Sequence, residues 1–183
     1  MIGKGTRLLV ALLFAGAGIG WMASDRGRNT IPELSSRNLQ SYSDTNLPYD
    51  GKYHFFRVQY DVGRGSSGFF RRREPAWAHD YPRAERNFLN IIQETTFVDS
   101  QTEGSNILRL NDPEIFKYPI AYIVEVGSWN PTEEEVAGLG AYLLKGGFLI
   151  VDDTRNERGN EWANFAYHMQ RALPGLSLTP LEH

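Results

Sequence analysis

The sequence contains no cysteine among its 183 residues. This absence excludes a thiol nucleophile, thiolate metal ligands and disulfide bonds, and it leaves the cellular compartment open. Excess positive charge is also lacking, because 19 lysine and arginine residues face 22 aspartate and glutamate residues, a net charge of −3. Basic patches are the usual electrostatic footprint of nucleic-acid binding. We therefore expect no nucleic-acid partner.

Hydrophobic residues make up 41% of the chain and aromatic residues 13%. This content is enough to build a core and excludes a wholly disordered protein. The length allows one ordinary domain and little more. No internal repeat is visible in the sequence.

The first 28 residues indicate export. Lys4 and Arg7 precede an apolar span at residues 8–23, which is slightly shorter than the roughly 20 residues of a membrane-spanning helix. The small residues Ala15, Gly16 and Ala17 suit a cleavage site. Residues 1–28 are thus interpreted as a signal peptide or an N-terminal membrane anchor, with cleavage left open. An exported, periplasmic or otherwise extracytoplasmic protein is predicted, secreted or held at the membrane by this segment if it stays uncleaved.

Residues 29–52 are polar and are interpreted as a linker, so that residues 53–183 form the globular domain. Within that domain, a glycine-serine stretch at residues 63–68 is followed by three arginines at 71–73. Such a basic run can grip phosphate groups, but a solvated loop is favoured because the glycines imply mobility. The stretch also lacks the spacing of a phosphate-binding loop.

Residues 118–153 read as a strand, a helix and a second strand without a gap. The apolar run at 120–126 is typical of a strand covered on both faces. Asn130 and Pro131 suit the start of a helix that ends near Lys145, with Glu133 as the partner in a capping box. Two glycines end this helix, and residues 148–151 form the next strand.

Parallel strands joined by a helix end at the same edge of a sheet. Glu125, Asp152 and Asp153 follow these two strands, so we expect them to gather at the carboxyl edge, where open α/β folds bind ligands. Because neighbouring side chains on a strand point in opposite directions, the two aspartates should differ in role. One should turn toward the site and the other should bond backbone amides of the following loop.

The remaining pattern alternates strands with helices. Strands are predicted at residues 53–60, 95–98 and 107–110, with a further edge strand at 176–178. A helix beginning at Pro82 is expected to bury Ala84, Phe88, Ile91 and Ile92, and a helix over 161–173 to bury Trp162, Phe165, Met169 and Leu173. His168 is interpreted as a structural histidine. The fold class is therefore α/β, with a layered, mainly parallel sheet and helices on both faces.

Several segments together resemble one bacterial family, domain of unknown function 4159. They are FFRVQYD, WAHDYPRAERNFL, the run from Asn111 to Phe116 with Tyr118-Pro119, and GGFLIVDD followed by EWANF. The resemblance implies a flavodoxin-like layered sheet similar to the class I glutamine amidotransferases, and it implies no established activity. Family members continue past an acidic-His-Pro-hydrophobic motif, whereas this chain stops at Leu181-Glu182-His183. The resemblance thus predicts a domain truncated at its C-terminus, or an ending that derives from an expression vector.

Amidotransferase chemistry needs a cysteine, so glutaminase activity is excluded. Ser128 lies near the position of a nucleophile but lacks the G-x-S-x-G spacing. The candidate ligand-binding residues are Asp80, Tyr81, Glu125, Trp129, Asp152 and Asp153. Their carboxylates can cap turns and helices, hold a divalent cation, or divide into an acid and a base. The sequence assigns no residue a catalytic role, and a divalent cation is the cofactor that the residue types admit.

Four aromatic residues, Trp77, Tyr81, Trp129 and Trp162, form either a sugar-stacking platform or part of the core, and core is favoured. The predicted function is an envelope domain that binds a ligand or partner without catalysis. Other envelope proteins or a carbohydrate are the expected partners. The alternative is a hydrolase that uses the carboxylates at the sheet edge, with carbohydrate as one substrate class.

Overall fold

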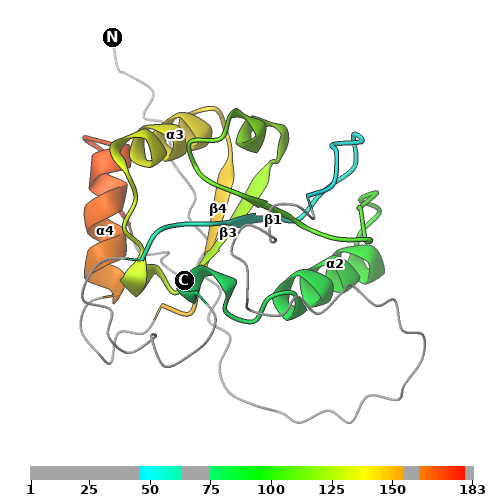
Figure 1. Cartoon of the computed structure of the whole chain (residues 1–183). Coiled ribbons are helices and arrows are strands. Elements are labelled where there is room, and N and C mark those ends of the chain that lie inside the picture. Colours follow the sequence, from blue (N-terminus) through cyan, green and yellow to red (C-terminus); the bar gives the residue numbers. More distant parts are fainter. Residues whose placement is uncertain (1–45, 63–74, 155–160, 180–183) are drawn as a thin grey trace.

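The computed structural model describes residues 46–62, 75–154 and 161–179 of the chain (Figure 1). The expected signal or anchor segment, most of the polar linker, the stretch from 63 to 73 and the last four residues lie outside this described part. Among the residues that are described, no helix combines the length and the apolar character needed to cross a membrane.

Four parallel strands form one sheet in the order β2-β1-β3-β4. The strands are β1 (Phe56–Val58), β2 (Asn106–Leu108), β3 (Ile120–Val124) and β4 (Phe148–Asp152). The predicted α/β class is therefore confirmed. The order equals that of the first four strands of a flavodoxin-like sheet, in which the direction of winding reverses between β1 and β3. Ligands in such folds bind at the carboxyl ends of the strands beside this reversal.

The β3-α3-β4 unit confirms the strand–helix–strand prediction. Helix α3 (Glu133–Leu144) joins the two strands, and Ile120 pairs with Phe148 at the start of a parallel register. The predicted cap at Asn130 is wrong. The helix is capped by Thr132, whose side chain accepts a hydrogen bond from Glu135 N while the Glu135 carboxylate accepts one from Thr132 N. This reciprocal box satisfies two backbone donors, which a single Asn cap cannot do.

The sheet is covered on both faces, by α3 and α4 (Glu161–Ala172) on one side and by α2 (Arg83–Thr95) on the other (Figure 1). Side chains on β3 alternate between these faces. Ala121 and Ile123 join the large apolar core on the α3 side, and Tyr122 and Val124 join a smaller cluster on the α2 side. Helices α3 and α4 approach closely because Gly140 has no side chain. A Cβ there would lie 2.3 Å from the carbonyl oxygen of Ala172.

The buried stripe expected for α2 is correct in part. Ala84 and Phe88 pack against the smaller apolar cluster, but the fully buried residues of the helix are Glu85 and Leu89, and Ile91 is 57% exposed. The predicted strand at 95–98 does not form, since the helix continues to Thr95. Thr95 and Thr96 donate hydroxyl hydrogen bonds to the carbonyls of Ile91 and Ile92, which satisfies the helix end.

The C-terminal helix also differs from its prediction in detail. Residues 176–178 form no strand in the structure. Trp162 is 36% exposed, and the buried face of α4 consists of Phe165, His168, Met169 and Ala172. His168 thus replaces Trp162 on the buried face, packing 5.1 Å from the ring of Trp129.

Three short 3-10 helices complete the described part: η2 (Ala76–Ala78), η3 (Pro113–Lys117) and η4 (Val126–Ser128). Of these, η3 directly precedes Tyr118, and Asp112 caps it by accepting a hydrogen bond from Glu114 N. The other two matter for the site because they flank the carboxyl ends of the strands. His79 directly follows η2, and Glu125 directly precedes η4.

Candidate functional site

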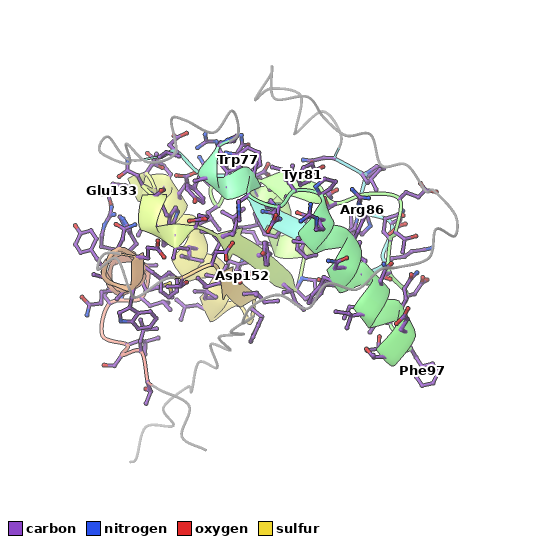
Figure 2. The ribbon with its side chains drawn as sticks, turned by 90° about the horizontal axis from the view of Figure 1, so that it is seen from below. Trp77, Tyr81, Arg86, Phe97, Glu133 and Asp152 are labelled. Atoms are coloured by element: carbon purple, nitrogen blue, oxygen red, sulfur yellow. The ribbon has the colours of Figure 1, made fainter. Side chains whose placement is uncertain are left out.

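Three side chains converge at the carboxyl edge of the sheet: His79, Glu125 and Asp153. Glu125 is the first residue after β3, and Asp153 is the first after β4. His79 comes from the segment between β1 and α2. Figure 2 views the molecule from this end, with the segment that carries Trp77 and Tyr81 above the end of β4 at Asp152. The site therefore lies beside the β1–β3 reversal, where the strand order predicts ligand binding.

The imidazole of His79 is the centre of this group. Its Nδ1 lies 2.9 Å from Asp153 Oδ2, within hydrogen-bond distance. The same atom lies 3.8 Å from Glu125 Oε1 and 3.8 Å from Asp80 Oδ2. One ring nitrogen thus faces carboxylates that arrive from three separate segments of the chain.

The three acidic residues around His79 share an unusual backbone conformation. Asp80, Glu125 and Asp153 have φ values of 59°, 54° and 51°. Within the described part of the chain, these are the non-glycine residues with positive φ. A left-handed backbone costs a non-glycine residue roughly 1–2 kcal/mol. Such strain gathers at functional sites when the surrounding fold holds it in place.

Burial is uneven within the group. The side chain of Glu125 is 7% exposed, that of His79 is 22% and that of Asp153 is 31%. The hydroxyl of Tyr60 donates to the carbonyl oxygens of Val124 and Glu125 and fixes the turn that carries the buried carboxylate. Burial, together with the charge of Glu125, raises the pKa of Tyr60, so this hydroxyl remains a donor at neutral pH.

The dimensions of the group suit a metal ion. One nitrogen and two carboxylate oxygens all lie within 4.8 Å of one another. With ligand bonds of about 2.1 Å, adjacent ligand atoms around a cation stand about 3.0–3.4 Å apart. The separations of 2.9 and 3.8 Å from His79 Nδ1 bracket that range. Imidazole nitrogen with carboxylate oxygen is a ligand set for zinc, iron or manganese.

Asp152 and Asp153 take different partners. Asp152 Oδ2 accepts a hydrogen bond from the Tyr122 hydroxyl at 2.8 Å, and its Oδ1 accepts from Asp153 N at 2.8 Å. Asp153 instead faces His79. Asp152 therefore holds the turn, and Asp153 contributes to the convergent group.

The other candidate residues are dispersed. Asp80 lies beside the group with a half-exposed side chain, 3.7 Å from Arg83 in an ion pair, and its backbone carbonyl, not its side chain, bonds the start of α2. Tyr81 packs against the apolar core. Trp129 is 1% exposed and contacts Phe165, which excludes it from a ligand-binding surface.

The aromatic platform does not form, because Trp77 is 2% exposed and Trp129 is equally buried. Both fill core, as the favoured interpretation held. Ser128 is 7% exposed within η4.

Sequence reasoning missed His79, the central residue of the group, and Arg57, which lies under it. His79 stands in the WAHDYP segment beside Asp80, and that adjacency to a candidate carboxylate was the available signal. Arg57 stands in an aromatic strand, where a charged residue among buried neighbours signals a paired interior group.

The chain belongs to the family described as Domain of unknown function (DUF4159), whose model matches residues 54–183. The match spans all of the described site. No curated protein shows detectable similarity to the sequence.

Proposed function

We propose that this domain binds a divalent cation through His79, Glu125 and Asp153 and presents it to a ligand at the carboxyl edge of the sheet. The convergence of these three side chains within 4.8 Å carries the proposal. Their origin in three separate segments supports it. Local sequence effects do not bring such residues together.

Charge balance supports the same proposal. Glu125 is almost fully buried, and Asp153 shares the imidazole of His79 with it. Buried carboxylates are paired or bound to metals, since an uncompensated buried charge is costly. A divalent cation would add two positive charges beside these two carboxylates. We infer that the cation would replace the hydrogen bond between His79 Nδ1 and Asp153 Oδ2 and would be bound by both atoms.

The chemistry of the site follows from three protein ligands. A cation held by three side chains retains coordination positions for water or for a hydroxyl, carbonyl or carboxylate group of a ligand. Glu125 and Asp153 would hold the cation at the carboxyl edge of the sheet. Protons compete with the cation for the imidazole and the carboxylates, so affinity falls as the solution is acidified.

Thermal unfolding with and without added ions tests the proposal. Zinc or manganese at a hundredfold excess over its dissociation constant should stabilise the protein by about 2.7 kcal/mol by mass action. His79→Ala should abolish this ion-dependent shift and leave the melt without ions nearly unchanged. His168→Gln, which replaces a histidine outside the convergent group, is the matched control and should retain the shift. An equal shift in the His79 variant would refute the proposal.

A hydrolase remains the second candidate, and one observation favours it. His79 Nδ1 lies 2.9 Å from Asp153 Oδ2, which is the pairing that orients a histidine general base. The buried tryptophans withdraw support for carbohydrate as the substrate. Hydrolysis of chromogenic ester substrates, lost in Asp153→Asn and only reduced in Asp152→Asn, would select this function over binding alone.

We also propose that the fold is related to the class I glutamine amidotransferases, with a carboxylate in place of the nucleophile. Glu125 has a left-handed conformation at the turn from β3 into η4, the kind of strained strand-to-helix turn that presents a nucleophile in α/β enzymes. Since the sequence contains no cysteine, glutaminase chemistry is not part of the proposal.

An envelope location remains a prediction based on Lys4, Arg7 and the apolar span at residues 8–23. Fusion of residues 1–52 to an enzyme that is active only outside the cytoplasm tests it. An active fusion is expected, and a silent cytosolic fusion would overturn the prediction. Other envelope proteins remain the proposed partners.

A further inference from the structure

Arg57 is a charged residue in the interior of the sheet. It lies in the middle of β1 on the α2 side, and its side chain is fully buried. Its Nε forms an ion pair with Glu85 of α2, which is 1% exposed. A buried pair of this kind often contributes little to stability, because desolvation offsets the attraction. Its position under the site suggests another role.

The guanidinium reaches the segment that carries His79. Arg57 Nη1 donates hydrogen bonds to the carbonyl oxygens of Trp77 at 2.9 Å and His79 at 3.0 Å. These two bonds tie both sides of Ala78 to the centre of β1. Only the rigid fork of arginine offers several donors in one plane, so Nε can hold Glu85 while Nη1 holds the loop.

The same guanidinium is also linked to Asp153, through Tyr122 and Asp152. It stacks over the ring of Tyr122 on β3, 4.9 Å from the ring centroid. The Tyr122 hydroxyl donates to Asp152 Oδ2, and Asp152 Oδ1 accepts from the backbone of Asp153. Burial raises the pKa of Tyr122, which keeps this hydroxyl protonated. A continuous set of contacts therefore runs from Arg57 to the backbones of His79 and Asp153.

We propose that Arg57 is a positioning residue for the cation site and that Tyr122 extends its effect to Asp153. This proposal rests on the proposed function. If the site binds a cation, the role of Arg57 is to keep His79 Nδ1 and Asp153 Oδ2 close enough to share it. It assigns to the buried Arg57–Glu85 pair a geometric role. Partners that orient metal ligands in this way typically change affinity 10–100-fold when they are lost.

The decisive variant removes the pair and keeps the interior filled. Arg57→Met with Glu85→Leu replaces two buried charges by apolar side chains, an exchange that folded proteins often tolerate. We expect a cooperative melt near that of the wild type, with cobalt(II) affinity lowered about 10–100-fold and a changed cobalt absorption spectrum. Arg57→Lys keeps the charge opposite Glu85 and should recover part of the affinity.

The matched control is Arg109→Met. Arg109 also bonds two carboxylates, Asp61 and Glu135, but it follows β2, on the far side of β1 from the site. Its replacement should leave both the cobalt affinity and the spectrum unchanged. Should the double variant not fold, the Arg57→Lys and Tyr122→Phe variants carry the test through the same two readouts.

Hydrogen exchange at residues 76–81 separates this inference from the proposed function. Faster exchange there in the double variant, with no cobalt bound even by the wild type, would leave Arg57 as a positioning residue and refute the cation site. Unchanged exchange and unchanged cobalt affinity in a folded double variant would refute the role of Arg57. Faster exchange with weaker cobalt binding is the result that both proposals predict.

Discussion

The two faces of the sheet differ in what they bury. The α3 side buries a large apolar core that includes Ile123, Leu149 and Val151. The α2 side buries a smaller apolar cluster together with the charged pair Arg57 and Glu85. Burial of apolar side chains stabilises the fold but does not depend on the orientation of the groups, whereas hydrogen bonds and ion pairs fix the relative positions of the residues that form them. The comparison indicates that the α3 side supplies most of the apolar stabilisation, whereas the polar contacts on the α2 side position His79 and Asp153.

The largest expected effect comes from opening the apolar face. Ile123 is fully buried on β3 toward α3, so Ile123→Ala should lower the free energy of unfolding by about 2–5 kcal/mol. Urea denaturation measures it. The folded fraction should bind zinc as the wild type does, because the α2 side is untouched. Ile91→Ala, at an exposed position, is the control and should change stability by less than about 0.5 kcal/mol. Equal losses of stability in Ile123→Ala and Ile91→Ala would contradict the conclusion that the core on the α3 side supplies most of the apolar stabilisation.

Glu125→Gly should raise the stability instead of lowering it. Glycine adopts the left-handed conformation of residue 125 without strain, and the change also removes a buried carboxylate. Stability without ions should rise by about 1 kcal/mol while cation binding is lost. Glu125→Gln keeps the backbone strain and removes only the charge. A smaller gain in the glutamine variant would assign the difference to backbone conformation, and a loss of stability in both variants would contradict the account.

Tyr122→Phe removes a single oxygen atom from the α2 side of the sheet. It removes the hydrogen bond to Asp152 and should cost about 0.5–1.5 kcal/mol. Zinc affinity should fall as well, since Asp152 holds the backbone of Asp153. Urea denaturation measures the loss of stability, and isothermal titration calorimetry measures the zinc affinity. Tyr167→Phe, on the exposed side of α4, should change neither, and a Tyr122 variant with full affinity would limit the positioning network to Arg57.

The smallest effect concerns pH on the apolar side. Burial and the neighbouring Arg171 lower the pKa of His168. The unfolded chain therefore binds a proton at this residue more readily than the folded one. Its stabilising contribution is present above the ordinary histidine pKa of about 6.5 and is lost as the pH falls below it. His168→Gln should flatten the decline of stability between about pH 7.5 and 5, measured by urea denaturation at each pH. An unchanged slope would mean that another group causes the decline.

Local signals in the sequence were sufficient for much of the fold. The apolar runs of β3 and β4 and the glycines after α3 specify their elements through neighbouring residues, and a parallel sheet follows from that alternation. The errors occur where tertiary contacts decide. Thr132 replaced Asn130 as the cap because Glu135 completes a reciprocal box, and Ile91 is exposed because α2 turns Glu85 toward Arg57.

The candidate site was predicted in part for the same reason. Glu125 and Asp153 directly follow parallel strands, so the topology of the sheet places both at its carboxyl edge. His79 follows no strand and has no periodic pattern. A long connection and two hydrogen bonds from a buried arginine bring it to the edge. Trp129 was included among the candidates because an aromatic residue in a loop resembles a binding residue, and only packing shows that it is core.

Equilibrium dialysis against zinc and manganese tests the central claim most directly, with bound metal determined by elemental analysis. The account predicts one ion per chain in the wild type and none in His79→Ala, Glu125→Gln or Asp153→Asn at the same free ion concentration. Asp152→Asn disturbs only the turn that holds Asp153, so this variant should still bind one ion per chain, with lower affinity than the wild type. No ion in the wild type, or equal binding by the Asp152 and Asp153 variants, would contradict the assignment of the site.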